Sequence, residues 1–218
     1  METQNQDVKK IITIFVKVAA KPDSTEIARK ALLEDVHGAW TEPGNYKMEL
    51  YSALGQPENY YLFERWESRE ALEAHFTQSY TAGAFTLQDG HLKEDIQMNY
   101  LTDLLPSAQD LKSDDSRKAY TTLMVPFEVK TGYGNEFAEL FKAFVPSVRN
   151  EPGNVNFNFH RVDGQDVKFL LYERWLSQDF LDQHNQLQAT ADFVALVSPL
   201  LTAAVYDFVL FSTDISEY

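Results

Sequence analysis

The chain contains an internal repeat. Glu42-Pro43-Gly44-Asn45 returns 109 residues later as Glu151-Pro152-Gly153-Asn154, and the same offset persists through the residues that follow. Between Glu42–His75 and Glu151–His184 there are 13 identities in 34 ungapped positions, including the Glu-Arg-Trp triplet that ends one segment of each copy. A repeat of roughly 100 residues has the size of a small domain. We therefore predict two copies of one fold in tandem.

A polar segment separates the copies. Residues 106–116 carry no apolar periodicity, as is typical of a linker. We predict a first domain at residues 8–104, a linker at 105–118 and a second domain at 119–216.

Each copy predicts a βαββαβ unit. Apolar residues alternate at 12–18 and again at 121–127, which predicts a first strand in each copy, and a helical apolar period follows until the Glu-Pro-Gly-Asn turn. Two further strands, a second helix and a last strand at 95–102 or 206–212 complete the unit. This order is that of a ferredoxin-like α+β fold, with four antiparallel strands covered on one face by two helices.

The second face of each predicted sheet is apolar. Tyr61 and Phe63 in the first copy, and Leu170 and Tyr172 in the second, lie opposite in phase to the tryptophans. We therefore expect the two sheets to pack together as a pseudo-twofold α+β barrel, an intramolecular version of a symmetric dimer. The chain should then fold as a monomer, with edge strands leaving a higher homo-oligomer open.

Composition excludes several classes of partner and site. Lys and Arg number 19 against 33 Asp and Glu, so the net charge of −14 disfavours nucleic acid and anionic membrane surfaces. The chain has no cysteine, and its five histidines show no metal-binding spacing, so we predict no metal and no cofactor. The first seven residues have no apolar stretch, unlike a secretory signal, which predicts a cytoplasmic protein.

Acid and histidine pairs are the candidate catalytic groups. Alternation places Glu64 and Glu173 on the same strand face as the leucine and tryptophan two residues away, where an isolated charge is costly. Helical spacing directs His75 and His184 toward the sheet, which predicts a Glu64–His75 pair and a Glu173–His184 pair. Such a pair can act as a general base for a phenolic proton, or it can be a buried structural pair. The adjacent arginines, Arg65 and Arg174, face the predicted interface between the sheets and are expected to form ion pairs there.

The motifs resemble a known family. A Glu-Pro-Gly turn after the first helix, a strand ending in Glu-Arg-Trp-x-Ser and a helix with Leu-x-x-His resemble the antibiotic biosynthesis monooxygenase domain, a dimeric α+β barrel family. The resemblance implies a pocket between helices and sheet in each unit, lined by the strand tryptophans and the leucines around them. The residues that this implies for substrate binding are Trp66, Trp175, Leu62, Leu171, Leu72 and Leu181.

The resemblance also implies a reaction. Polyketide-oxidising members have an asparagine and a tyrosine where this chain has leucines (62 and 171, 72 and 181), whereas Glu-Arg-Trp with Leu-x-x-His matches the quinol-oxidising branch. The implied activity is a cofactor-independent monooxygenase that oxidises a quinol or related aromatic small molecule with molecular oxygen. Two alternatives stay open: a non-catalytic binding or stress-response protein for aromatic molecules, and a haem-binding and haem-degrading enzyme, which would need an axial histidine in the pocket.

Overall fold

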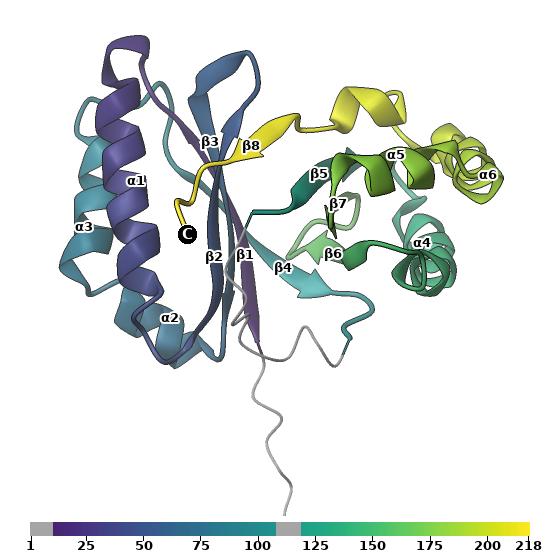
Figure 1. Cartoon of the computed structure of the whole chain (residues 1–218), viewed down its shortest axis with the longest axis horizontal. Helices are drawn as coiled ribbons and strands as arrows, with labels where there is room; N and C mark the ends of the chain where they lie inside the picture. Colours follow the sequence, from purple (N-terminus) through teal and green to yellow (C-terminus); the bar gives the residue numbers. More distant parts are fainter. Residues whose placement is uncertain (1–10, 108–118) are drawn as a thin grey trace, which may run out of the picture.

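The computed structural model describes residues 11–107 and 119–218 (Figure 1). The predicted start of the first domain at residue 8 and most of the predicted linker, residues 108–118, lie outside the described residues. The two predicted units are visible as two groups of helices on either side of a central set of strands (Figure 1).

The first unit has four strands and three α-helices. Strand β1 alternates less than expected because most of its residues are buried on both faces, one against the helices and one inside the molecule. The elements are β1 (Ile12–Ala19), α1 (Thr25–Ala39), β2 (Asn45–Ala53), β3 (Gln56–Trp66), α2 (Arg69–His75), α3 (Ser79–Phe85) and β4 (Gln97–Asp103). Short 3₁₀ helices lie at Pro22–Ser24 and Thr86–Gln88.

The second unit repeats this order up to its last strand. Helix α4 has a strongly one-sided distribution of large apolar side chains and lays them on the sheet. The elements are β5 (Thr121–Glu128), α4 (Gly134–Arg149), β6 (Asn154–Val162), β7 (Lys168–Trp175), α5 (Gln178–Gln186), α6 (Gln188–Val197) and β8 (Ser212–Asp214). The 3₁₀ helices are Ser198–Leu200 and Val205–Phe208. In both units the predicted second helix is two helices separated by a short break.

All eight strands form one sheet that crosses between the units. The order is β5-β7-β6-β4-β1-β3-β2-β8, every pairing within it is antiparallel, and β4 of the first unit pairs with β6 of the second. Strand β8 leaves the second unit and pairs with β2 of the first, placing Tyr51 opposite Asp214. An isolated bridge between Met124 of β5 and Leu210, two residues before β8, brings the two ends of this order together, so the strands close into a barrel.

The barrel interior is the shared apolar core that the sequence predicts. Phe63 and Tyr172 stack across the pseudo-twofold axis, with ring centroids 3.8 Å apart and planes 5° from parallel. Around them lie buried residues of both units: Phe15, Tyr51, Tyr61, Leu101, Met124 and Leu170. The α+β barrel built from two ferredoxin-like units is therefore confirmed.

The last strand of the second unit differs from the prediction. Residues 206–212 were expected to form it, but Val205–Phe208 is a 3₁₀ helix and the strand begins only at Ser212. The physical reason is that this segment crosses from the second unit to the first. It runs from α6 to the edge of β2, and only its last residues reach a strand edge with which they can pair. In Figure 1 this yellow segment crosses from the second group of helices to the first.

Candidate active site

The two units differ in the space between helices and sheet. The second unit has an open cavity of about 830 Å³ between α4, α5, α6, the sheet and the C-terminal segment. The corresponding space in the first unit is about 30 Å³, enough for one water molecule. The expectation of a usable pocket in each unit is therefore wrong for the first unit.

Close packing of α3 on α1 closes the first unit. A Cβ on Gly38 would lie 2.5 Å from the ring of Tyr80, so the absence of a side chain lets the two helices approach. In the second unit Ser147 stands in place of Gly38, and Ala189 stands in place of Tyr80. The second unit therefore lacks both the glycine that admits the ring and the ring itself.

Aromatic rings hold the second unit open. Phe144 of α4 and Phe193 of α6 stack in parallel with centroids 4.0 Å apart, where the first unit has Asp35 and Ala84. Six phenylalanines line the cavity, and 109 residues earlier the first unit has no aromatic residue at any of these positions. They are Phe127, Phe141, Phe144, Phe157, Phe193 and Phe211, which correspond to Val18, Leu32, Asp35, Met48, Ala84 and Thr102. The cavity therefore has walls suited to an aromatic ligand.

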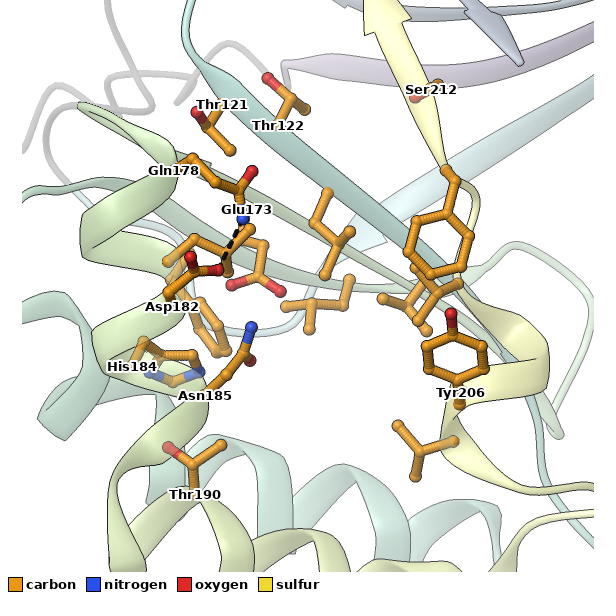
Figure 2. Close-up of a pocket in the computed structure, with 18 of the residues that line it drawn as sticks. Thr121, Thr122, Glu173, Gln178, Asp182, His184, Asn185, Thr190, Tyr206 and Ser212 are labelled. Atoms are coloured by element: carbon orange, nitrogen blue, oxygen red, sulfur yellow. Dashed lines mark hydrogen bonds between the residues drawn. The ribbon is translucent and has the colours of Figure 1, made fainter. Parts of the chain in front are cut away.

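Polar groups gather on one wall of the cavity (Figure 2). They come from the end of β7 and from helices α5 and α6: Glu173, Gln178, Asp182, His184, Asn185 and Thr190. Gln178 donates a hydrogen bond to Asp182 at 2.7 Å, and the buried hydroxyl of Thr190 has no hydrogen-bond partner within residues 11–107 and 119–218. An apolar cavity with a few convergent polar groups is the usual form of a small-molecule site.

Glu173 is a buried carboxyl group at the cavity wall. Burial raises its pKa to about 7, the hydrogen bond from Trp175 opposes that rise, and the nearby charge of Glu151 adds to it. The indole N–H of Trp175 donates to Oε2 of Glu173 at 2.9 Å. Near neutral pH this group exists in both its protonated and its ionised form.

His184 is held by a different acid from the one predicted. Its Nδ1 lies 2.8 Å from Oε2 of Glu151, the glutamate of the Glu-Pro-Gly-Asn turn, and its ring packs on Trp175 with centroids 4.9 Å apart. The predicted direct pair with Glu173 is wrong because the indole of Trp175 already binds that carboxyl group, while Glu151 approaches from the turn. Among the described residues, Nε2 of His184 has no hydrogen-bond partner.

The first unit repeats these contacts without the cavity. His75 Nδ1 lies 2.7 Å from Oε1 of Glu42, and the indole of Trp66 donates to Glu64 at 3.0 Å. Burial raises the pKa of Glu64 to about 7, against the hydrogen bond of Trp66 and the charge of His75. The predicted Glu64–His75 pair is therefore also replaced, and both side chains border only the small cavity.

The predicted ligand-lining residues divide into two groups. Leu171 and Leu181 line the large cavity, and Leu62 lines the small one. Trp66, Trp175 and Leu72 are wholly buried and line neither cavity of the described structure, because the indoles turn into the core to reach the glutamates. Contact of these three residues with a ligand stays a prediction.

Several residues of the site escaped the sequence analysis. The turn glutamate was read only as part of a turn, although it repeats at a fixed separation of 33 residues from the histidine in both copies. Gln178, Asp182 and Asn185 of α5 are Arg69, Glu73 and Phe76 in the first copy, so the repeat gave no signal for them, whereas Thr190 of α6 does repeat Thr81. Leu54, from the β2–β3 turn of the first unit, also lines the cavity of the second.

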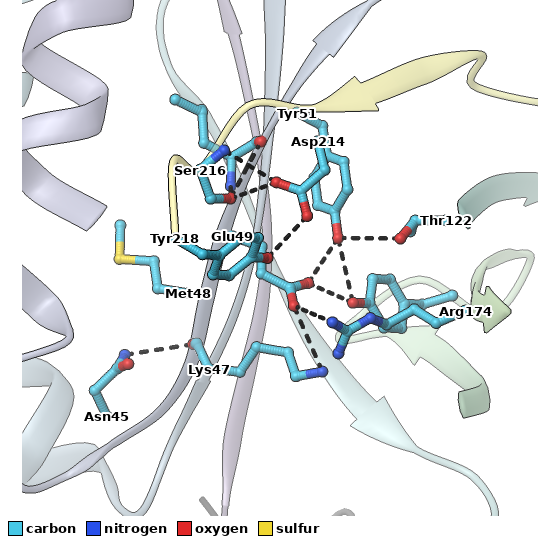
Figure 3. A network of polar contacts seen from close by, with 12 residues as sticks. Asn45, Lys47, Met48, Glu49, Tyr51, Thr122, Arg174, Asp214, Ser216 and Tyr218 are labelled. Atoms are coloured by element: carbon cyan, nitrogen blue, oxygen red, sulfur yellow. Dashed lines mark hydrogen bonds and ion pairs between the residues drawn. The ribbon is translucent and has the colours of Figure 1, made fainter. Parts of the chain in front are cut away.

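The predicted arginine ion pairs are present at the barrel interior. Arg65 lies 2.9 Å from Asp103, and Arg174 lies 3.0 Å from Glu49 of the other unit. Figure 3 shows Glu49 at the centre of a cross-unit network, where it also accepts hydrogen bonds from the hydroxyls of Tyr51, at 2.6 Å, and Tyr172. Burial opposes ionisation, but the charges of Lys47 and Arg174 and the two tyrosines together lower the pKa of Glu49.

The described residues contain neither a metal-binding cluster nor a helix able to span a membrane. No group of three or more His, Cys, Asp or Glu residues within residues 11–107 and 119–218 is arranged to hold a metal ion. Among the helices of the described ranges, none combines the length and apolar character that crossing a bilayer requires.

Known proteins place this architecture in a family. The sequence profile described as "Antibiotic biosynthesis monooxygenase" matches residues 11–85 and 121–196, one match in each unit. The two matches together cover more than half of the chain. The chain therefore belongs to the antibiotic biosynthesis monooxygenase family and carries two copies of its domain.

Solved structures agree on the fold of the whole chain. A candidate monooxygenase from Fusobacterium nucleatum has a TM-score of 0.76 at 14% identity, covering 95% of both chains. One from Lactobacillus acidophilus has a TM-score of 0.69 at 12% identity, covering 89% of this chain and 90% of the other. The uncharacterised Synechocystis protein sll1783 is 32% identical over 101 residues, 45% of this chain and 67% of that protein.

Proposed function

We propose that the chain is a cofactor-independent monooxygenase that oxidises a quinol, or a related electron-rich aromatic, with molecular oxygen in the cavity of its second unit. The observation that carries this proposal is the aromatic cavity of about 830 Å³ with a histidine and a carboxyl group on its wall. Family membership supports a monooxygenase, and the cavity supports the class of substrate.

His184 is the proposed general base. With the Nδ1 proton donated to Glu151, Nε2 is left to accept the phenolic proton, and the glutamate stabilises the imidazolium that forms. The phenylalanines beside His184 give the ring an apolar surrounding, in which the phenolate is less stabilised by water and is a stronger electron donor.

The proposed reaction balances without a metal or an added reductant. The phenolate transfers one electron to oxygen, the resulting radical pair forms a carbon–oxygen bond at an adjacent ring carbon, and the imidazolium returns the proton to the peroxide. Loss of water then leaves a hydroxyquinone. Quinol plus oxygen thus becomes hydroxyquinone plus water. Glu173 in its protonated form can donate a hydrogen bond to the second ring oxygen.

The test is oxygen uptake with menadiol, measured against its autoxidation. We expect the protein to accelerate uptake, with one labelled oxygen atom from ¹⁸O₂ in the product. Tight binding of menadione without any acceleration would instead favour a non-catalytic binding protein. A hemin titration that produces a sharp Soret band lost in His184→Gln would favour a haem protein, because it would supply the axial histidine which that alternative needs.

A further inference from the structure

The cavity is larger than a two-ring quinol requires. Its volume of about 830 Å³ lies in the upper part of the range, roughly 300–1,000 Å³, that holds drug-sized ligands. A bicyclic ring placed against His184 and Glu173 would leave much of the cavity unfilled. Binding is strengthened most when an apolar ligand group covers the apolar wall of a cavity. The remaining space therefore predicts an additional apolar group on the substrate.

An apolar rim continues from the cavity to the protein surface. Leu54, Tyr206 and Phe211 line the cavity and are also 61%, 72% and 42% exposed. They contact one another: the backbone N–H of Leu54 donates to the carbonyl of Phe211 at 2.7 Å, and the rings of Tyr206 and Phe211 lie 5.2 Å apart. We call these three residues the apolar rim.

The apolar rim lies across the cavity from the proposed catalytic groups. Figure 2 shows His184, Glu173 and Asn185 on one wall and Tyr206 on the opposite side. A ring whose hydroxyl groups face the polar wall would therefore direct a ring substituent toward the rim. The rim offers such a substituent apolar contacts, and its three residues carry no charge.

We propose that the substrate is a quinol bearing a long alkyl or prenyl chain, and that the apolar rim binds this chain. The inference rests on the proposed function and specifies its substrate. An anionic bilayer is the less suitable occupant of the rim because the chain carries a net charge of −14. Leu54 belongs to the first unit, which assigns that unit a part in substrate choice although its own cavity is closed.

The test measures binding of quinones, which do not react with oxygen. A series of 2-alkyl-1,4-naphthoquinones from methyl to dodecyl is titrated into the full chain by calorimetry. Each methylene that reaches the rim should strengthen binding by about two- to fourfold, until the chain extends beyond it. The variant Leu54→Ser with Tyr206→Ser and Phe211→Ser should lose the dependence on chain length, so that it binds the dodecyl compound no more tightly than the methyl compound.

A control variant tests whether the effect is specific to the rim, and oxygen uptake is measured separately from quinone binding. Leu176→Ser with Leu196→Ser removes two exposed apolar side chains that do not line the cavity, and it should keep the dependence. Equal affinity for all chain lengths in wild type, or an unchanged dependence in the rim variant, would overturn the proposal. The proposal would also be overturned if sedimentation showed that wild type is an oligomer and that the rim variant is a monomer. The rim would then be the surface that binds a second copy of the chain. Chain-length dependence without oxygen uptake would contradict the oxygenase function and leave the rim assignment standing.

Discussion

His184 Nδ1 lies 2.8 Å from Oε2 of Glu151, and in the first unit His75 Nδ1 lies 2.7 Å from Oε1 of Glu42. The same acid–histidine contact thus exists twice, once beside a large cavity and once in a closed core. The contact stabilises the turn and helix in both units. Only the adjacent open space gives the second copy access to a ligand, so the two copies provide internal controls for each other.

Glu151→Gln should slow the reaction while Glu42→Gln should not. The amide keeps a hydrogen-bond acceptor for the histidine but removes the charge that stabilises its protonated form. We expect kcat to fall by less than the ~10²- to 10⁴-fold that a general base contributes. Glu151→Asp, which returns the negative charge, should restore part of the rate. Stopped-flow measurement of oxidation across pH checks this, and equal losses in the two glutamine variants would contradict a role at the second cavity.

Filling the cavity should block binding without unfolding the chain. Thr190 lines the large cavity with an unpartnered hydroxyl, so Thr190→Phe should abolish menadione binding and leave the free energy of unfolding equal or higher. The matched change Thr81→Phe enters a closed core and should cost about 1–3 kcal/mol. Urea unfolding combined with calorimetry checks both. Retained binding in Thr190→Phe would show that the ligand site lies elsewhere.

The buried carboxyl group of Glu64 should make stability depend on pH. Its pKa is raised to about 7 in the folded chain, from 4.5, so its contribution is fully present below pH 4.5 and is lost as pH rises through 7. Glu64→Gln removes this loss. Between pH 4.5 and 8 the variant should therefore gain about 1–3 kcal/mol relative to wild type. Parallel urea titrations at several pH values measure the difference, and a constant difference would contradict the burial of an ionisable Glu64.

The cross-unit network should be costly to break from one side. Glu49→Gln leaves Arg174 and Lys47 buried beside a neutral group, which should destabilise the chain by about 3–5 kcal/mol. The exposed pair between Arg29 and Glu217 is the comparison, and Arg29→Ala should cost less than about 1 kcal/mol. Chemical unfolding followed by tryptophan fluorescence gives both values. Similar small losses in the two variants would mean that Glu49 is not the centre of the interface.

The sequence was sufficient to predict what the two copies share. The apolar face of Tyr61 and Phe63 required a partner sheet, and the repeat supplied one, which is why the barrel and the interface arginines follow from pattern alone. The glutamates were also correctly predicted to be enclosed and to have polar partners, because burial on an apolar face demands one. The identity of those partners depended on side-chain direction, which periodicity does not define.

The sequence could not predict what distinguishes the copies. Whether Phe144 and Phe193 fill space or hold two helices apart depends on the packing of both rings, and helical periodicity assigns either residue simply to a core. The pairing of β8 with β2 could not be predicted for a related reason. Alternation of apolar residues predicts a strand, but it does not say which unit contains the neighbouring strand. The asymmetry of the two cavities arises from these tertiary contacts.

The most direct test of the account is oxygen uptake with menadiol by His184→Gln and His75→Gln, beside wild type. Both variants alter a buried histidine that contacts a turn glutamate, and only His184 borders the large cavity. We expect His184→Gln to lose about 10²- to 10⁴-fold of the rate, and folded His75→Gln to retain the wild-type rate. Full activity in His184→Gln, or an equal loss in folded His75→Gln, would contradict the assignment of the reaction to the second unit.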